Sequence, residues 1–323
     1  MRKKTSAARK FKVGQYAVLY FDLMGVRQSL FRGIDYHSSE VDQEKQFEID
    51  RTCGSVLGFL KGIKGLHEQF TRHPEELYEQ FMAGCEEAKS PDHRAEFLRQ
   101  VKCLHVGIQQ GSDTTLLYVK DDCEVAQMIV SMWMLTLPLY ILSAMSKGVL
   151  VRGCLTRGTG WEMRKNCLFG PVIHEAAVAE ETTADYPRIV VTGSFYSMCA
   201  TTLARMQISQ PPPTCSINPF KMLDVDVDGR VVFDYLGAVA LAGLKEMYEK
   251  KGYELSQLEK MINQARDFVL MRLAENRNNK RLSDIYQKLL SYINDRLRKY
   301  IVTVSSMDHE ADYKKEKHRR GRT

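Results

Sequence analysis

The chain has 323 residues, of which 44% are hydrophobic and 27% charged, an ordinary composition for a soluble globular protein. This length accommodates one large domain with elaborations or two domains, with an ample core. The net charge of +6 does not indicate a nucleic-acid-binding face, because the basic excess lies at the two ends of the chain. We expect residues 1–14 and 304–323 to be disordered basic tails and the body between them to be mildly acidic.

Eight cysteines are spread along the chain without any CxxC pair, and no signal peptide precedes them. This pattern indicates reduced thiols in a cytoplasmic protein and excludes a zinc site of the usual spacing. Residues 126–146 contain no charge and are long enough to cross a bilayer. Pro138 near their centre, and the strand-like run that follows directly, favour a buried helix of a soluble domain, with a membrane scaffold as the alternative.

The first half of the chain predicts two strand regions separated by helices. A strand over 16–22 ends in a glycine turn, and apolar residues at helical spacing follow from about 38 to 103. A hairpin of two strands, 101–110 and 114–119, turns at Gly111-Ser112-Asp113, and the uncharged helix at about 122–146 comes next.

The second half begins with a strand over 149–156, which we expect Gly158 and Gly160 to end. Pro171 opens a helix that continues to Glu181. The remaining elements are a strand at 188–192, a helix at 195–206, a hairpin at 221–227 and 230–235, and a helical region from about 236 to 301 with an apolar stripe over 255–270.

The order β-α-β-β-α-β predicts an α+β fold with a ferredoxin-like sheet. We expect a catalytic domain over 15–210, with a helical insertion at about 38–103, and a hairpin with C-terminal helices over 211–303. The apolar stripe of these helices either packs on its own domain or pairs two subunits.

Two aspartates, Asp22 and Asp113, follow apolar strand segments of the predicted sheet. A carboxylate at a buried strand end is costly to keep ionised without a cation or a donor nearby. Two of them suggest a shared divalent metal site, which usually serves phosphate chemistry. The plainer alternatives are a helix cap for Asp22 and a turn residue for Asp113.

Five segments resemble, in order, the motifs of the class III nucleotide cyclase family. They are Phe21-Asp22-Leu-Met-Gly25-Val26, Gly111-Ser112-Asp113, Leu150-Val-Arg152-Gly-Cys-Leu-Thr156, Cys167-Leu-Phe169-Gly170-Pro-Val-Ile-His174-Glu-Ala176-Ala and Tyr186-Pro-Arg-Ile-Val-Val-Thr192. The detailed pattern is most similar to the bacterial pyrimidine cyclases of the Pycsar antiphage system. Those enzymes make cyclic UMP or cyclic CMP upon phage infection, and the messenger activates a separate effector.

The resemblance implies a ferredoxin-like class III cyclase domain, with an antiparallel or mixed sheet flanked by helices. It implies that two Mn²⁺ or Mg²⁺ ions are held by Asp22, Asp113 and the Leu23 carbonyl. Backbone N–H groups of Met24, Gly25 and Val26 would bind the triphosphate. The reaction needs the ribose 3′-hydroxyl placed in line with departing pyrophosphate, which is positioning and charge neutralisation.

The base-reading positions of the family fall on Gln109 and Cys167. Glutamine both donates and accepts hydrogen bonds, so it suits uracil, cytosine or guanine. For either residue, a role in strand packing is an equally good interpretation. UTP is the favoured substrate, CTP is second, and an adenylyl or guanylyl cyclase on the same scaffold is the nearest alternative.

The chain departs from the family pattern at the transition-state residues. The usual asparagine aligns with His174 and the usual arginine with Val178, so the cation at the developing phosphate charge is missing. Arg152, Arg157 or a basic residue of a second protomer could replace this cation. His174 is either a phosphate contact or a partly buried helix residue without such a role. These departures leave open a degenerate domain that binds nucleotide without turnover.

The partners follow from the same resemblance. Class III sites lie between two catalytic domains, and this chain shows one such domain, so a homodimer with two sites is expected. We expect no membrane and no stable nucleic-acid partner.

Overall fold

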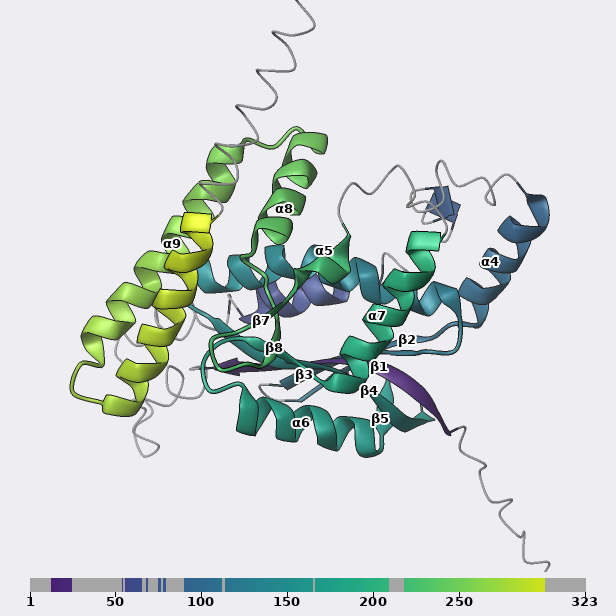
Figure 1. The fold of residues 1–323 in the computed structure, drawn as a ribbon, viewed down its shortest axis with the longest axis horizontal. Coiled ribbons are helices and arrows are strands. Elements are labelled where there is room, and N and C mark those ends of the chain that lie inside the picture. Colours follow the sequence, from purple (N-terminus) through teal and green to yellow (C-terminus); the bar gives the residue numbers. More distant parts are fainter. Residues whose placement is uncertain are drawn as a thin grey trace, which may run out of the picture.

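Figure 1 shows the computed structural model of the chain, coloured from the N-terminus to the C-terminus. The structure describes residues 13–24, parts of 54–79, and the ranges 90–111, 114–164, 166–208 and 218–299. Among the predicted site residues, Gly25, Val26 and Asp113 lie outside this described part, as do both basic tails.

The centre of the fold is an eight-stranded mixed sheet. Its strand order is β2-β3-β1-β4-β6-β8-β7, with β5 paired to β4 off this path. The β4–β6 pair is parallel and the other pairs are antiparallel. The strands are β1 (Val13–Met24), β2 (Val106–Gln110), β3 (Thr114–Lys120), β4 (Leu150–Arg164), β5 (Cys167–Phe169), β6 (Ile189–Val191), β7 (Leu223–Val225) and β8 (Val231–Phe233).

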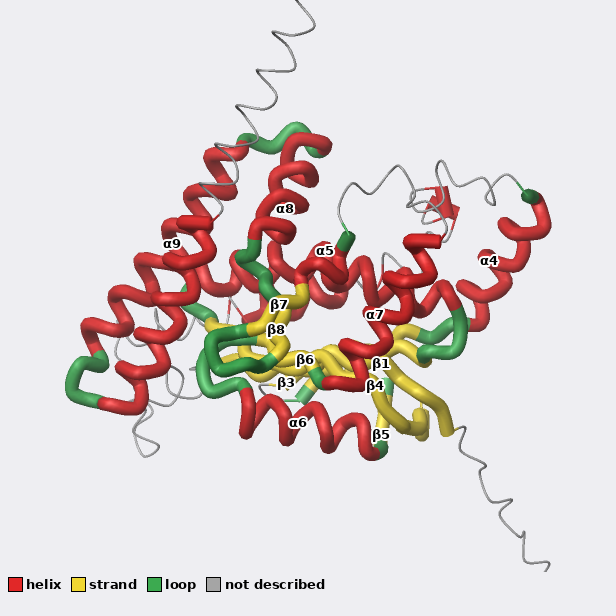
Figure 2. Tube along the Cα trace, viewed as in Figure 1, coloured by secondary structure: helices red, strands yellow, loops and turns green. Residues whose placement is uncertain are grey.

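Helices cover both faces of this sheet. In Figures 1 and 2, α6 lies under one face, and α5, α7 and α8 lie over the other. The helices are α4 (Pro91–Cys103), α5 (Glu124–Ser146), α6 (Pro171–Thr183), α7 (Gly193–Ile208), α8 (Ala238–Lys250) and α9 (Leu255–Glu275), followed by a last helix over 280–299. The predicted mixed sheet flanked by helices is confirmed in this sense.

The alternation of side chains along β1 decides which face each residue serves. Leu19, Phe21 and Leu23 point into the main core between the sheet and α5, whereas Tyr16 and Val18 join the smaller cluster between the sheet and α6. Asp22 shares the parity of the second set. Its carboxylate therefore belongs to the α6 face of the sheet.

The uncharged helix predicted near 122–146 is α5, and it forms the centre of the main core. Trp133, Met134, Leu137 and Ile141 are almost completely buried. Within the described residues, one helix, Val125–Ser146, is long enough and apolar enough to cross a membrane. However, 61% of its most apolar stretch is buried inside the protein. This burial fits the core helix of a soluble protein.

Two predicted boundaries of the strands are wrong. The strand β4 does not end at Gly158 and Gly160 but continues to Arg164. Both glycines pair with β1, opposite Tyr16 and Gly14. A Cβ atom at Gly160 would lie 3.0 Å from the Phe169 carbonyl oxygen, so this glycine permits close approach of another segment and does not end the strand.

The second boundary concerns the strand predicted over 101–110. It begins only at Val106, because residues 101–103 complete α4. The helix ends when Leu104 adopts an extended conformation, and its N–H still bonds the Gln100 carbonyl at 2.9 Å.

The C-terminal part continues the same sheet and core. β8 pairs with β6, so the second hairpin extends the sheet. The apolar stripe of α9 is buried at Leu258, Ile262, Ala265 and Val269, and α9 packs against α5. The stripe therefore packs on its own chain.

Candidate active site

Asp22 lies near the end of β1, between two neighbouring strands. Its partner on β3 is Thr114, and its partner on β4 is Arg152. The Nη2 atom of Arg152 donates to Oδ2 of Asp22 at 3.2 Å. The Asp22 side chain keeps 21% of its surface exposed, so the carboxylate is accessible from one side while a cation holds it from the other.

Arg152 also forms an ion pair with Glu180 on α6. Glu180 is 5% exposed, and burial raises the pKa of its carboxyl to about 7. The Asp22 charge raises that pKa further, and the Arg152 charge opposes the rise. We call these three residues the Asp22 cluster. It places one guanidinium between two carboxylates at the sheet–helix boundary.

The second predicted aspartate belongs, by sequence, to the turn between β2 and β3. Asp113 lies outside the described residues, but Thr114, which follows it, is the direct partner of Asp22. The hairpin closes through the Gly111 N–H, which donates to the Thr114 carbonyl at 2.8 Å. One peptide unit therefore separates Asp113 from the residue opposite Asp22.

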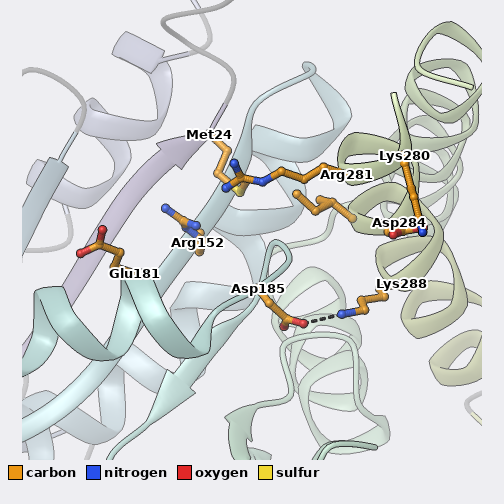
Figure 3. Close-up of a pocket in the computed structure, with 9 residues that line it drawn as sticks. Met24, Arg152, Glu181, Asp185, Lys280, Arg281, Asp284 and Lys288 are labelled. Carbon is orange, nitrogen blue, oxygen red and sulfur yellow. Dashed lines mark hydrogen bonds and ion pairs between the residues drawn. The ribbon is translucent and has the colours of Figure 1, made fainter. Parts of the chain in front are cut away.

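A pocket of about 570 Å³ adjoins the Asp22 cluster. Figure 3 shows its lining side chains, which come from β1, β4, the end of α6, the loop after α6 and the last helix. We call it the Met24 pocket; it is lined by Met24, Arg152, Glu181, Asp185, Lys280, Arg281, Asp284, Ile285 and Lys288. Arg152 is common to the pocket and to the cluster. Lys288 is paired with Asp185 across the pocket.

The predicted base-reading residues lie close to each other. The Oε1 atom of Gln109 accepts a hydrogen bond from the Leu168 N–H at 3.0 Å, next to Cys167. Gln109 pairs with Leu116 on β3, which in turn pairs with Tyr20, two residues before Asp22. Gln109 therefore links β2 to β5 on the Asp22 face, and its amide NH₂ group is not used in that bond.

Other predicted phosphate contacts lie elsewhere. His174 is exposed on α6, and Val178 is 40% exposed. Helix residues separated by two positions point about 200° apart around the axis. Val178 therefore points away from Glu180 and from the sheet. Arg157 pairs with Asp121, and its strand partner is Ala17, five positions from Asp22 along β1. Neither His174 nor Arg157 joins the Asp22 cluster.

The donor atoms near Asp22 suit a hard divalent cation. A carboxylate, a second carboxylate one residue from Thr114 and the Leu23 carbonyl are oxygen ligands of the kind that Mg²⁺ and Mn²⁺ prefer. No group of three His, Cys, Asp or Glu side chains able to hold an ion occurs within the described residues, a set that lacks Asp113. The cysteines do not contribute; Cys103, Cys123, Cys154, Cys167 and Cys199 are free thiols, and burial raises the pKa of Cys199 to about 12.

The sequence interpretation missed Glu180, Lys280 and Arg281. Glu180 follows Val172 and Ala176 at a spacing of four, and all three are buried on one face of α6. A carboxylate in an apolar stripe is a signal that the sequence already contained. Lys280 and Arg281 gave no such signal, because only the packing of the last helix brings them to the pocket.

No protein-family model matches this chain, and no curated protein matches it in sequence.

Proposed function

We propose that this protein is a nucleotide cyclase of the class III type that converts UTP, or CTP, to the 3′,5′-cyclic monophosphate and pyrophosphate. The observation that carries the proposal is the register around Asp22. Thr114, the residue after Asp113 in the sequence, is its strand partner on one side, and Arg152 is its partner on the other side and holds its carboxylate. An Asp113 carboxylate beside that of Asp22 would suit a two-metal phosphate site.

The strand order also supports the proposal. The elements β1, α4, β2, β3, α5 and β4 follow the β-α-β-β-α-β order, and their strands lie as β2-β3-β1-β4. This is the arrangement of a ferredoxin-like sheet. We propose that it is the class III cyclase version, with the five motifs of the sequence lying on β1, the β2–β3 hairpin, β4, the start of α6 and β6.

The residues have distinct tasks in this reaction. When bound, two Mn²⁺ or Mg²⁺ ions would acidify the ribose 3′-hydroxyl and neutralise the leaving pyrophosphate. Asp22, Asp113 and the Leu23 carbonyl would hold them, and the backbone after Leu23 would bind the triphosphate through Met24, Gly25 and Val26. Arg152 keeps the Asp22 carboxylate in place through the ion pair at 3.2 Å.

Base selection is assigned to the β2–β5 edge. The amide NH₂ group of Gln109, which the bond from Leu168 does not use, can donate to a uracil carbonyl, and the neighbouring Cys167 would form the other wall. His174 and Val178 lie on the outer face of α6, where they would meet a second protomer of a homodimer. A cytoplasmic enzyme that acts in antiphage defence through a separate cyclic-nucleotide-activated effector completes the proposal.

The experiment that tests the proposal is incubation of the pure protein with each of the four nucleoside triphosphates and Mn²⁺, followed by separation of the products. The proposal expects cyclic UMP or cyclic CMP. Conversion of ATP or GTP alone would identify an adenylyl or guanylyl cyclase on the same scaffold. Absence of any cyclic product would contradict the enzyme assignment.

A second candidate is a nucleotide-binding module without turnover. The ion pair of Arg152 with Asp22 favours it, because a guanidinium already satisfies the carboxylate that the metal needs. Under this alternative, nucleotide binding persists while the wild-type protein forms no product with any of the four substrates.

A further inference from the structure

The first turn of the last helix presents two basic side chains to the Met24 pocket. The Asn279 Oδ1 atom accepts a hydrogen bond from the Leu282 N–H at 3.2 Å, which caps the helix over 280–299. Lys280 and Arg281 are the first two residues after this cap. Cations are unfavourable at the positive end of a helix, so a bound anion would relieve this electrostatic conflict.

These two side chains have no partner among the residues that the structure describes. The other cations of the pocket are engaged, Arg152 with Asp22 and Glu180, and Lys288 with Asp185. By contrast, no hydrogen bond or ion pair within the described ranges involves the Lys280 ammonium or the Arg281 guanidinium. In Figure 3, Arg281 extends from the last helix toward Met24 and Arg152.

The pocket adjoins the proposed metal position directly. Met24, which lines the pocket, follows Asp22 by two residues at the end of the same strand. Arg152 lines the pocket and contacts Asp22 at 3.2 Å. An anion bound by the last helix would therefore lie beside the Asp22 carboxylate, within a cavity of about 570 Å³.

We propose that Lys280 and Arg281 bind the polyphosphate tail of the nucleoside triphosphate in the Met24 pocket. This inference rests on the proposed cyclase function and deepens it. The planar guanidinium of Arg281 matches two phosphate oxygens at once, and Lys280 adds a second positive charge. Together they supply from the C-terminal helix the positive charge that Val178 cannot supply from α6.

The acidic side chains of the pocket set a condition on this binding. Glu181 and Asp284 line the same cavity, and Asp284 lies one helical turn after Lys280. Their negative charges oppose a bare polyphosphate. A divalent cation that accompanies the polyphosphate reduces this repulsion, so binding should require Mg²⁺.

The test measures calorimetric binding of inorganic tripolyphosphate with Mg²⁺ to the full chain. The double variant Lys280→Ala/Arg281→Ala should weaken binding by at least about tenfold, because each lost partner is a charged hydrogen bond. The matched control Lys260→Ala/Arg298→Ala removes the same charge from exposed positions outside the pocket and should bind as wild type. Asp284→Asn should bind more tightly.

The inference is overturned if the wild-type protein does not bind tripolyphosphate, or if the double variant binds it as well as the control. Thermal unfolding of each variant verifies that these exposed substitutions leave the fold intact. Rescue by Lys280→Arg/Arg281→Lys, which keeps both charges, should restore most of the affinity.

The phosphate site and the cyclase activity can each fail without the other. If wild type makes no cyclic nucleotide but binds tripolyphosphate through Lys280 and Arg281, the cyclase assignment fails and the phosphate site stands. If wild type cyclises UTP and the double variant has the same KM as the control, the cyclase assignment stands and the phosphate site fails.

Discussion

Asp22 and Arg152 are direct partners across the antiparallel strands β1 and β4, with 3.2 Å between the Asp22 Oδ2 and Arg152 Nη2 atoms. The same guanidinium is paired with the buried Glu180 of α6. One cation thus joins the sheet to the helix that covers it, and it keeps two carboxylates in the same small volume.

Removing this cation should destabilise the protein. In Arg152→Gln, Asp22 and Glu180 lose their shared cation and must either remain charged without it or take up protons. We therefore expect the free energy of unfolding to fall by about 2–3 kcal/mol. Urea unfolding at pH 7.5 measures it. Arg164→Gln, at the exposed end of β4, should have little effect, and an unchanged midpoint for Arg152→Gln would contradict the bridging role.

Glu180 should make stability depend on pH in the neutral range. Its pKa in the folded state is about 7, above its ordinary value of 4.5, since burial disfavours its charge. The stability that protonation provides is complete below about pH 4.5 and is lost as pH rises through 7. Glu180→Gln should therefore gain stability relative to wild type, by up to about 3 kcal/mol above pH 7.

The matched control for this titration is Glu181→Gln, the exposed neighbour on the same helix. Urea unfolding from pH 4.5 to 8.5 gives the comparison. A constant difference between Glu180→Gln and wild type across this range would refute the raised pKa.

A second buried ion cluster should control stability in acid. Arg188 is 3% exposed, is paired with Asp226 and Asp228, and lies over the Tyr186 ring at 4.8 Å. Burial raises the pKa of Asp226, but hydrogen bonds from Tyr186, the Val227 N–H and Arg188 outweigh it, so the net pKa is lowered. The stability that this ionised carboxylate provides is present above about pH 4 and is lost as pH falls further.

Arg188→Leu should lower the free energy of unfolding by about 3–5 kcal/mol, because it leaves the buried Asp226 without its cation. The control is Arg230→Leu, an exposed residue of the β7–β8 hairpin, which should lower the free energy of unfolding far less. Thermal unfolding at pH 7 compares them. Equal melting temperatures would show that the cluster is not what joins β6 to the β7–β8 hairpin.

Gln109 offers a test of base selection that spares the fold. Gln109→Glu keeps the Oε1 acceptor of the Leu168 N–H but replaces the NH₂ donor with a second acceptor. Since cytosine presents an amino group where uracil presents a carbonyl, the ratio of kcat/KM for UTP to that for CTP should fall at least about tenfold. An unchanged ratio, with Gln110→Glu as the control, would limit Gln109 to strand packing.

The sequence predicted the elements around Asp22 well because their signals are local. A continuous apolar run predicted β1, the absence of charge predicted α5, and Pro171 predicted the start of α6. Glycines were misread in β4, since Gly158 and Gly160 permit close packing within a continuous strand.

The rest of the site depends on contacts that no local pattern encodes. Glu180 reaches Arg152 only because α6 packs over β4, and Lys280 and Arg281 reach the Met24 pocket only because the last helix folds back on the end of β1. Such contacts join residues far apart in the sequence. Their partners become visible when the sheet, α6 and the last helix are in place.

The central claim is that Asp22 and Asp113 act as one metal site in a cyclase. The most direct measurement is the rate of cyclic UMP formation from UTP and Mn²⁺ for wild type, Asp22→Ala, Asp113→Ala and the double variant, with Ser112→Ala as the neighbouring control. We predict turnover by wild type and the control, and an equal loss of at least about a thousandfold in both single variants and the double, because residues that act as a unit are not additive. Retained turnover in either single variant would contradict the claim.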